Sequence, residues 1–156
     1  MAATVWVVDD DPTILDVLGA MLKQLGYQVE LFDHGKTVLE RYEANPPDLV
    51  VADLRMPGMG GLDLTRALLE KDPQAIIMIL TGYPSIPDAV EAIRLGAADF
   101  ISKPCTLGEI HVRIERAMAN RRLERRLKRT RQVMWALVES LPVWIILGMV
   151  LARLLK

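Results

Sequence analysis

The feature that most constrains the fold is a short apolar run that ends on a single carboxylate. Residues 49–52 are Leu-Val-Val-Ala, Asp53 follows directly, and a loop rich in proline and glycine comes next. An apolar run of this length between turn residues is typical of a strand buried on both faces, as in a parallel sheet. A charge has no packing role at the end of such a strand, and open α/β sheets bind ligands at that edge. Asp53 is therefore predicted to be a site residue.

Three other apolar runs end on polar residues in the same way. Residues 4–8 lead into Asp9-Asp10-Asp11, residues 75–80 into Thr81-Gly82, and residues 99–102 into Lys103-Pro104. Apolar residues at helical spacing separate these runs, and right-handed crossovers would place the helices on both faces of a parallel sheet. If the strands lie side by side, carboxylates, a hydroxyl and an ammonium group meet at one edge of that sheet.

The alternation predicts five strand–helix units between Thr4 and about Arg122. Strands are predicted at 4–8, 27–32, 48–53, 75–80 and 99–102. Helices are predicted from Pro12 until Gly26, at 35–44, 61–71 and 84–95, and from about 106 onward. Pro12 suits the first position of a helix, where its missing N–H is not needed, and Asp11 is the predicted cap.

Composition and charge indicate a folded domain, and the cysteine content is compatible with a reducing compartment. About half of the 156 residues are apolar and a quarter are charged, which is typical of globular proteins. The formal net charge of −1 argues against a nucleic-acid interface over the whole protein. A single cysteine, Cys105, excludes an internal disulfide and a cysteine metal cluster. No basic region followed by an apolar core begins the sequence, so no secretory signal is apparent and a cytoplasmic location is predicted.

In this order, the strand-end residues resemble those of the receiver domain of two-component response regulators. The resemblance covers about Thr4 to Arg122. It rests on Asp9-Asp10, Asp53 with Met56-Pro57-Gly58 behind it, Thr81-Gly82, Phe100 and Lys103-Pro104. It implies a flavodoxin-like (βα)5 doubly wound parallel sheet with strand order 2-1-3-4-5. A receiver domain is thus predicted at 1–122 and a helical C-terminal extension at 123–156.

The resemblance implies that Asp53 accepts a phosphoryl group from a histidine kinase or a phosphotransfer protein. The implied cofactor is Mg²⁺, with Asp9, Asp10, Asp53 and the backbone carbonyl of Arg55 as its protein ligands. Mg²⁺ favours octahedral oxygen ligands, which agrees with this set. The chemistry implied is at most Mg²⁺-dependent self-phosphorylation from a donor and slow self-dephosphorylation, so the protein is not expected to be a metabolic enzyme.

The same resemblance implies roles for Lys103, Thr81 and Gly82. Lys103 would pair with Asp53 before the reaction and with a phosphoryl oxygen afterwards. Thr81 would hydrogen-bond another phosphoryl oxygen and draw its loop inward, and Gly82 would leave room for that approach. Positioning and charge stabilisation of this kind are what phosphoryl transfer requires.

The implied switch is the surface formed by the predicted helix at 84–95, the strand at 99–102 and the helix from 106. Thr81, Gly82 and Phe100 would change this surface after phosphorylation. Phe100 has no hydroxyl group, so a signalling bond that a tyrosine makes in relatives is absent here. A homodimer is expected through this surface or through the C-terminal helix.

Two other classes of protein share parts of this pattern. Aspartate-based phosphatases use a second aspartate two residues beyond the nucleophile, and Arg55 occupies that place here, which argues against this class. The remaining alternative is a docking adaptor or membrane scaffold with a receiver fold, in which phosphorylation is secondary.

The tail is strongly basic between Arg113 and Arg131 and strongly apolar from 133 to 155. A dimeric coiled coil is one interpretation, because a set of residues recurs at spacings of three and four. That set is Leu127, Thr130, Met134, Leu137, Leu141, Trp144, Gly148, Leu151 and Leu155. Pro142 and Gly148 disfavour the coiled coil.

A membrane anchor over 133–155 is the second interpretation, because this stretch is about long enough to span a bilayer. The arginine-rich stretch before it would then stay cytoplasmic. Glu139 and Pro142 disfavour the anchor. A nucleic-acid interface is not favoured, because the basic stretch lacks interleaved aromatic residues and a recognition motif. The sequence leaves the first two interpretations open.

Overall fold

The computed structural model describes the backbone of residues 2–154 and the side chains of residues 2–127, 130–132, 134 and 153. The chain divides into two compact units, Met1–Ala119 and Asn120–Lys156. The first unit contains the whole sheet, and each unit is described by itself.

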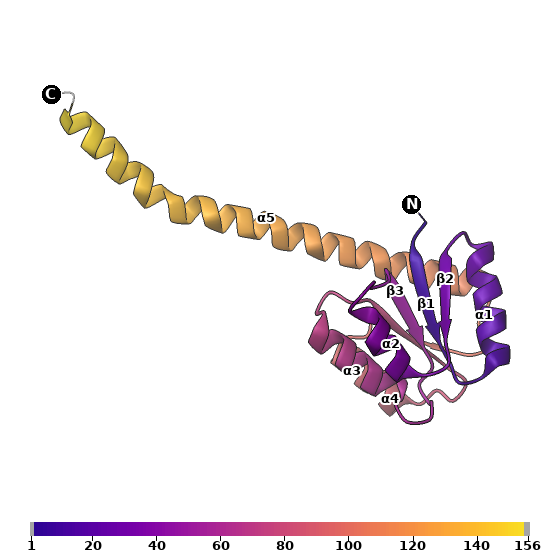
Figure 1. Cartoon of the computed structure of the whole chain (residues 1–156). Helices are drawn as coiled ribbons and strands as arrows, with labels where there is room; N and C mark the ends of the chain where they lie inside the picture. Colours follow the sequence, from indigo (N-terminus) through magenta and orange to yellow (C-terminus); the bar gives the residue numbers. More distant parts are fainter. Residues whose placement is uncertain (1, 155–156) are drawn as a thin grey trace. The chain divides into compact units, whose positions relative to one another are not determined.

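Five parallel strands form one sheet in the first unit (Figure 1). They are β1 (Thr4–Val8), β2 (Gln28–Phe32), β3 (Leu49–Ala52), β4 (Ile77–Thr81) and β5 (Asp99–Ser102). Their order across the sheet is β2-β1-β3-β4-β5. The flavodoxin-like fold and the strand order predicted from the sequence are therefore confirmed.

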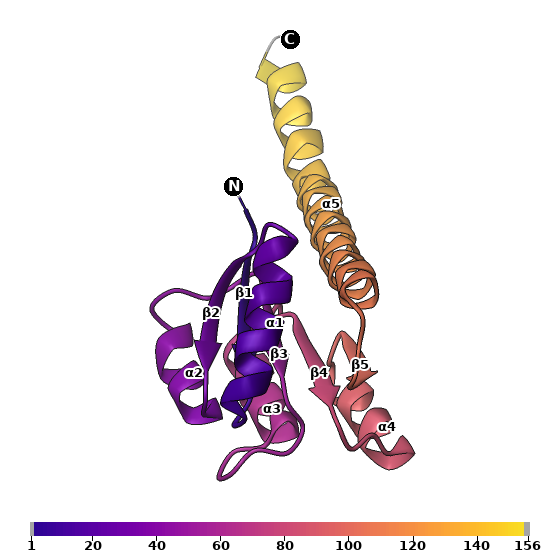
Figure 2. The same cartoon turned by 90° about the vertical axis from the view of Figure 1, so that its right-hand side faces the viewer.

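Helices connect the strands and cover both faces of the sheet, and α1 lies on the opposite side from α2 and α3 (Figure 1). The helices are α1 (Pro12–Gln24), α2 (Gly35–Tyr42), α3 (Gly61–Lys71), α4 (Ile86–Leu95) and α5 (Leu107–Leu154). In Figure 2, which is turned by 90° from this view, α4 lies close to β5.

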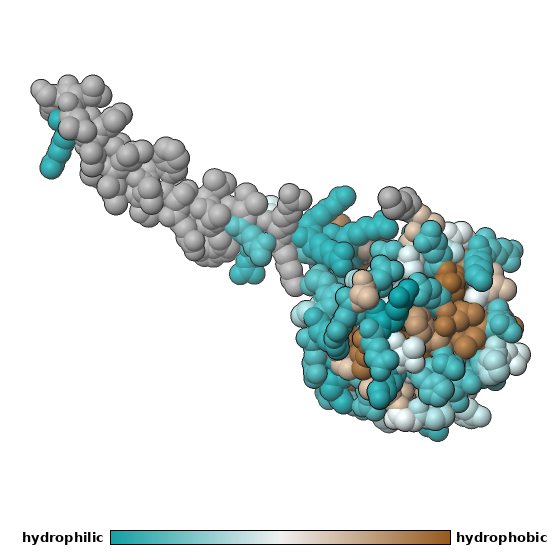
Figure 3. Space-filling model, viewed as in Figure 1, coloured by the Kyte–Doolittle hydropathy of each residue, from teal (hydrophilic) through white to brown (hydrophobic). Residues whose placement is uncertain are grey.

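Alternate residues of each strand point to opposite faces and form two separate apolar cores. Val5 and Val7 of β1 pack with α1 and the first turns of α5, whereas Trp6 and Val8 pack with α2, α3 and α4. Because both faces are buried in this way, the central strands consist almost entirely of apolar residues. Polar side chains dominate the face of this unit that is shown in Figure 3.

The helix ends largely follow the predicted capping residues. The Asp11 carboxylate accepts a hydrogen bond of 2.8 Å from the Thr13 N–H, which confirms the cap of α1. Helix α4 begins at Ile86 rather than at 84, because the Ser85 hydroxyl caps it by accepting from the Asp88 N–H. Gly96 ends α4 at a φ of 106°, a left-handed conformation that glycine adopts readily.

Helix α5 includes residues 123–154 of the predicted C-terminal extension. Among the residues that the structure describes, no helix is long and apolar enough to cross a membrane. The side chains of 133 and 135–152, on which the anchor and most of the coiled-coil pattern depend, lie outside the described residues. Both interpretations of the tail stay predictions.

Candidate functional site

Three side chains from separate strand ends meet at the carboxyl edge of the sheet. Asp9 follows β1, Asp53 follows β3, and these strands are neighbours in register from Val5↔Leu49 onward. The Lys103 ammonium lies 2.7 Å from Asp53 Oδ1 and also hydrogen-bonds Asp9 Oδ2. The Lys103 side chain is 17% exposed, that of Asp9 4% and that of Asp53 10%. Two nearly buried carboxylates thus share one cation.

The electrostatics of the cluster hold Lys103 in its charged form. Burial alone would lower the pKa of Lys103, but the hydrogen bonds and charges of Asp53 and Asp9 outweigh burial and raise it. The three groups together carry one excess negative charge. A site of this kind favours the approach of a further cation.

Backbone N–H groups fix the direction of both carboxylates. The Arg55 N–H donates to Asp53 Oδ2 at 2.7 Å, and the Asp11 N–H donates to Asp9 Oδ1 at 3.0 Å. Each bond reaches two residues along the chain, which is the local turn that aspartate favours. One oxygen of each carboxylate therefore faces the main chain and the other faces Lys103.

Thr81 lies at the end of β4, beside the strand that delivers Lys103. The Lys103 N–H donates to the Thr81 carbonyl at 2.8 Å, so the two residues are tied through the main chain. Thr81 is fully buried, and its hydroxyl oxygen accepts a hydrogen bond of 3.2 Å from the Tyr83 N–H. At Gly82, a Cβ atom would meet nothing within 4 Å, so the loop has open space there.

Two of the predicted residues have no hydrogen bond or ion pair with the Lys103 cluster among the contacts described for them. Asp10 is exposed, and Phe100 is partly buried against the core that contains α4. Within the described residues, no group of three carboxylate, histidine or cysteine side chains is placed to hold a metal. The donors at the cluster are carboxylate oxygens without sulfur or imidazole, and that chemistry fits Mg²⁺ better than zinc.

Gly61 allows the loop after Asp53 to pack closely against the end of β3. A Cβ atom at this position would lie 2.3 Å from the Asp53 carbonyl oxygen and 3.1 Å from Ile79 Cδ1. Since the nearest atom belongs to the backbone, it cannot turn away as a flexible side chain could. Gly61 is thus a positioning residue for Asp53.

We expect Gly61→Ala to lower the free energy of unfolding by about 2 kcal/mol, because the end of β3 must shift to admit the methyl group. Gly108→Ala is the matched control, because a Cβ atom there meets nothing within 4 Å. In a helix that change should be neutral or slightly stabilising. Urea unfolding of both variants measures the difference, and equal stabilities would contradict the role given to Gly61.

Two contacts in the structure are not predicted by any sequence pattern. One joins the loops after β3 and β4, and the other joins Tyr27 to α5. The Arg55 guanidinium carbon lies 5.6 Å from the centre of the Tyr83 ring. The Tyr27 hydroxyl donates to Glu115 at 2.9 Å and lies 3.3 Å from His111 Nδ1. Burial, together with Glu115, raises the pKa of Tyr27 to about 12. Each contact joins residues far apart in sequence, and neither forms a motif.

The sheet that carries these two carboxylates and the lysine has the strand order of receiver-domain folds. Residues 5–115 match the family model described as the response regulator receiver domain. This match covers more than half of the chain, so the chain belongs to the receiver-domain family of response regulators. Domains of this family interact with histidine kinases and generally depend on Mg²⁺.

Relatives and solved structures agree with the family match. The chain is 37% identical over 116 residues to the DNA-binding transcriptional regulator NtrC of Escherichia coli, covering 74% of this chain and 25% of NtrC. It is 35% identical over 142 residues to the C4-dicarboxylate transport transcriptional regulatory protein DctD of Rhizobium meliloti, covering 91% of this chain and 31% of DctD. The chain thus spans about a quarter to a third of the length of these relatives.

Two solved structures show the same fold. NtrX from Brucella abortus superposes with a TM-score of 0.77 at 30% identity, covering 83% of this chain and 30% of NtrX. A response regulator receiver domain protein from Clostridium thermocellum gives 0.73 at 28% identity, covering 78% of this chain and 98% of that protein.

Proposed function

We propose that the chain is a phosphorylation-operated switch in which Asp53 accepts a phosphoryl group from a histidine kinase or a phosphotransfer protein. The observation that supports this most strongly is the Lys103 ammonium placed between Asp53 and Asp9. A carboxylate that attacks phosphorus needs a fixed direction and a nearby cation for the incoming charge. Asp53 has both, because the Arg55 N–H orients one of its oxygens.

In the transfer, an Asp53 oxygen forms the new bond to phosphorus. The bond between phosphorus and the donor's imidazole nitrogen breaks, and its electron pair stays on that nitrogen. Once Asp53 has lost its full negative charge, Lys103 is available to pair with a phosphoryl oxygen. The Thr81 hydroxyl oxygen accepts from the Tyr83 N–H, so the hydroxyl hydrogen stays free to be donated. Thr81 can therefore donate a hydrogen bond to a second phosphoryl oxygen.

Asp9, Asp53 and the Arg55 carbonyl, with Asp10 as a further predicted ligand, would hold Mg²⁺. The ion supplies neutralisation of the phosphoryl charge when it is bound. The residues of the chain itself aim the nucleophile and hold most of the solvent away from it.

The surface that would signal the change lies over α4, β5 and the start of α5. A groove of about 320 Å³ there is lined by residues of all three elements, Ile86, Phe100 and Arg113 among them. Ile86, Val90 and Ile93 of α4 expose large apolar side chains beside it. A homodimer or another partner is proposed to cover this surface.

A direct test uses the full chain, Mg²⁺ and a small phosphodonor such as acetyl phosphate. Intact-mass measurement should show a gain of one phosphoryl group. No gain would favour the alternative, a docking adaptor or membrane scaffold in which phosphorylation is secondary.

The tail offers a second contact between copies, through the proposed coiled coil. Leu123, Leu127 and Met134 are exposed large apolar side chains at spacings of four and seven. On α5, the side chains that pack into the core of the first unit include Ile110, Ile114 and Ala117, which form one row along the helix. Residues 121 and 124 continue that row at the same spacing and are charged. The apolar stripe formed by Leu123, Leu127 and Met134 is therefore separate from the row that faces the core.

We expect the combined change Leu123→Gln and Leu127→Gln to weaken self-association at least tenfold, because it removes two apolar contacts from each helix. Gln132→Ala, at an exposed position off the stripe, should leave it unchanged. Sedimentation equilibrium measures the dissociation constant. Equal dissociation constants for wild type and double variant would contradict the coiled coil.

A further inference from the structure

The second unit begins with a dense run of positive charge, residues 121–131, which we call the basic segment. It contains seven basic side chains and one acidic side chain, so its net charge is +6. The whole segment belongs to helix α5, and its one carboxylate, Glu124, pairs with Arg121 at 2.8 Å. Arg122 and Arg126 are exposed, and neither takes part in an ion pair within the part of the chain that the structure describes.

The helix gathers most of these charges on one side. Six of the seven basic residues form two rows with spacings of four and three residues, Arg121-Arg125-Lys128 and Arg122-Arg126-Arg129. Arg125 and Arg129 are themselves four residues apart, so the two rows adjoin. At about 100° per residue, the apolar stripe of Leu123, Leu127 and Met134 lies on the other side of the helix. A coiled coil formed through that stripe would leave both basic rows facing outward.

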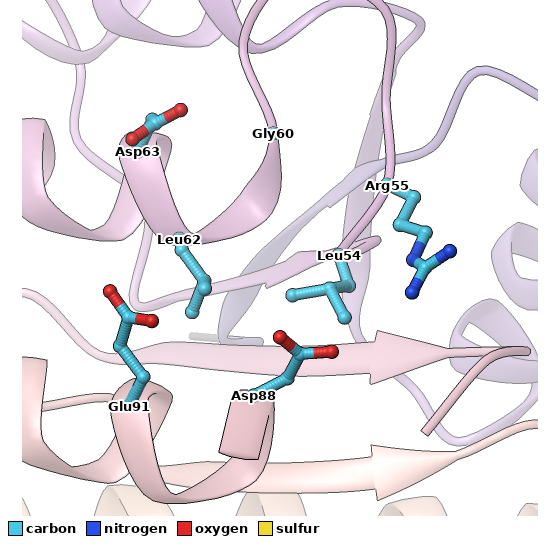
Figure 4. Close-up of a pocket in the computed structure, with 7 residues that line it drawn as sticks. All are labelled: Leu54, Arg55, Gly60, Leu62, Asp63, Asp88 and Glu91. Carbon is cyan, nitrogen blue, oxygen red and sulfur yellow. The ribbon is translucent and has the colours of Figure 1, made fainter. Parts of the chain in front are cut away.

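The first unit has the opposite charge. Residues 1–119 contain ten basic and eighteen acidic side chains, whereas residues 120–156 contain nine basic and two acidic ones. The carboxylates of Asp63, Asp88 and Glu91, for example, line a pocket of about 280 Å³ in the first unit (Figure 4). The first unit therefore repels an anionic partner, and the basic segment attracts one.

We propose that the basic segment binds the anionic headgroups of a phospholipid bilayer. Basic residues clustered on a helix beside an apolar run are typical of contacts with such headgroups. In the sequence, the apolar stretch 133–155 begins two residues after the segment. A bilayer offers this stretch an apolar environment, whereas the phosphodiester backbone of a nucleic acid does not. The segment also contains no aromatic residue that could stack on a base.

This contact requires only the basic rows. It does not depend on whether 133–155 spans the bilayer or pairs with a second copy of the chain. It also does not depend on phosphorylation of Asp53, so the proposed function and this inference can fail separately.

The test measures binding of the full chain to phospholipid vesicles by co-sedimentation. Vesicles of phosphatidylcholine alone are compared with vesicles in which about a third of the lipid is phosphatidylglycerol. Wild type should bind the anionic vesicles at least about tenfold more tightly. This preference should vanish in about 1 M salt, where the Debye length is about 3 Å. Equal binding to both kinds of vesicle, or binding to neither, would overturn the proposal.

Variants locate the contact. Arg122→Gln combined with Arg126→Gln should weaken binding to the anionic vesicles about 30-fold, because each basic residue near a bilayer surface contributes a factor of about five. Arg122→Lys combined with Arg126→Lys keeps both charges and should keep the wild-type affinity. Lys23→Gln combined with Arg94→Gln is the matched control, because it removes the same charge from exposed positions of the first unit. A glutamine variant of the basic segment that binds as tightly as this control would overturn the proposal.

A competition experiment separates a lipid surface from a nucleic acid. Duplex DNA is added to the anionic vesicles at an equal concentration of phosphate groups. The chain should stay on the vesicles, because the bilayer also receives the apolar stretch that follows the segment. Complete displacement by the DNA would assign the basic segment to a nucleic acid and overturn the proposal.

Discussion

Replacement of Lys103 by methionine is expected to lower the free energy of unfolding at pH 7 by about 3 kcal/mol and to abolish phosphorylation. Methionine keeps the length of the side chain but leaves Asp9 and Asp53, both nearly buried, without their shared cation. The variant must then hold two like charges in a poorly solvated place. The same change removes the cation that Asp53 needs when it attacks phosphorus.

The free energy of unfolding that Lys103→Met loses should depend on pH. In wild type the pKa of Lys103 is raised, so its stabilising contribution is complete below the pKa of an unfolded lysine and is lost only as strongly alkaline pH is approached. In the variant, two uncompensated carboxylates favour protonation. Their cost should therefore shrink as the pH falls from 7 toward 4, and the two stability curves should converge.

Lys71→Met is the matched control for this substitution. Lys71 pairs with Glu43 at the surface, where the side chains are 41% and 69% exposed. Surface pairs of this kind contribute at most about 1 kcal/mol. Chemical unfolding of both variants between pH 4 and 8 makes the comparison. Equal losses, or a loss in Lys103→Met that grows on acidification, would contradict the proposed role of the buried cluster.

Asp53→Asn is expected to abolish the gain of a phosphoryl group completely. The amide is nearly the same size as the carboxylate and can still accept from the Arg55 N–H, but it is not a nucleophile toward phosphorus. Its effect on stability should stay within about 1 kcal/mol, because the substitution also removes the excess negative charge beside Lys103. Activity is thus lost without unfolding.

Asp63→Asn controls for the loss of one carboxylate elsewhere. Asp63 is exposed in α3 and pairs only with Arg66 at 3.3 Å among the ion pairs described for it. This variant should gain a phosphoryl group as wild type does, measured by intact mass with acetyl phosphate and Mg²⁺. A gain in Asp53→Asn equal to that of Asp63→Asn would mean that the acceptor is another residue.

The fold could be predicted because β1, β3 and β4 are almost uninterrupted apolar runs, and because Gly26 and Gly96 act as stop signals after α1 and α4. β1 and β5 have the predicted bounds, and β4 begins two residues later because Ala75 and Ile76 lie in the connection before it. Asp9, Asp53 and Lys103 could be placed together since parallel strands end at one edge. The order and parallel direction of the strands are enough to bring these three residues to the same edge.

Other parts of the site depend on side-chain choices that a sequence pattern does not encode. Asp9 and Asp10 are adjacent, yet one is buried at the cluster and the other is exposed. The Arg55–Tyr83 contact depends on a side-chain direction within a loop. The close approach of Gly61 to the Asp53 carbonyl becomes visible only in three dimensions.

Locating the phosphoryl group tests the proposed role of Asp53 most directly. The full chain is phosphorylated with acetyl phosphate and Mg²⁺, reduced with borohydride, which converts an aspartyl phosphate to homoserine, and digested for peptide mass spectrometry. We expect homoserine at position 53 and at no other aspartate. Homoserine at another position, or an unmodified residue 53 in protein that has gained mass, would contradict it.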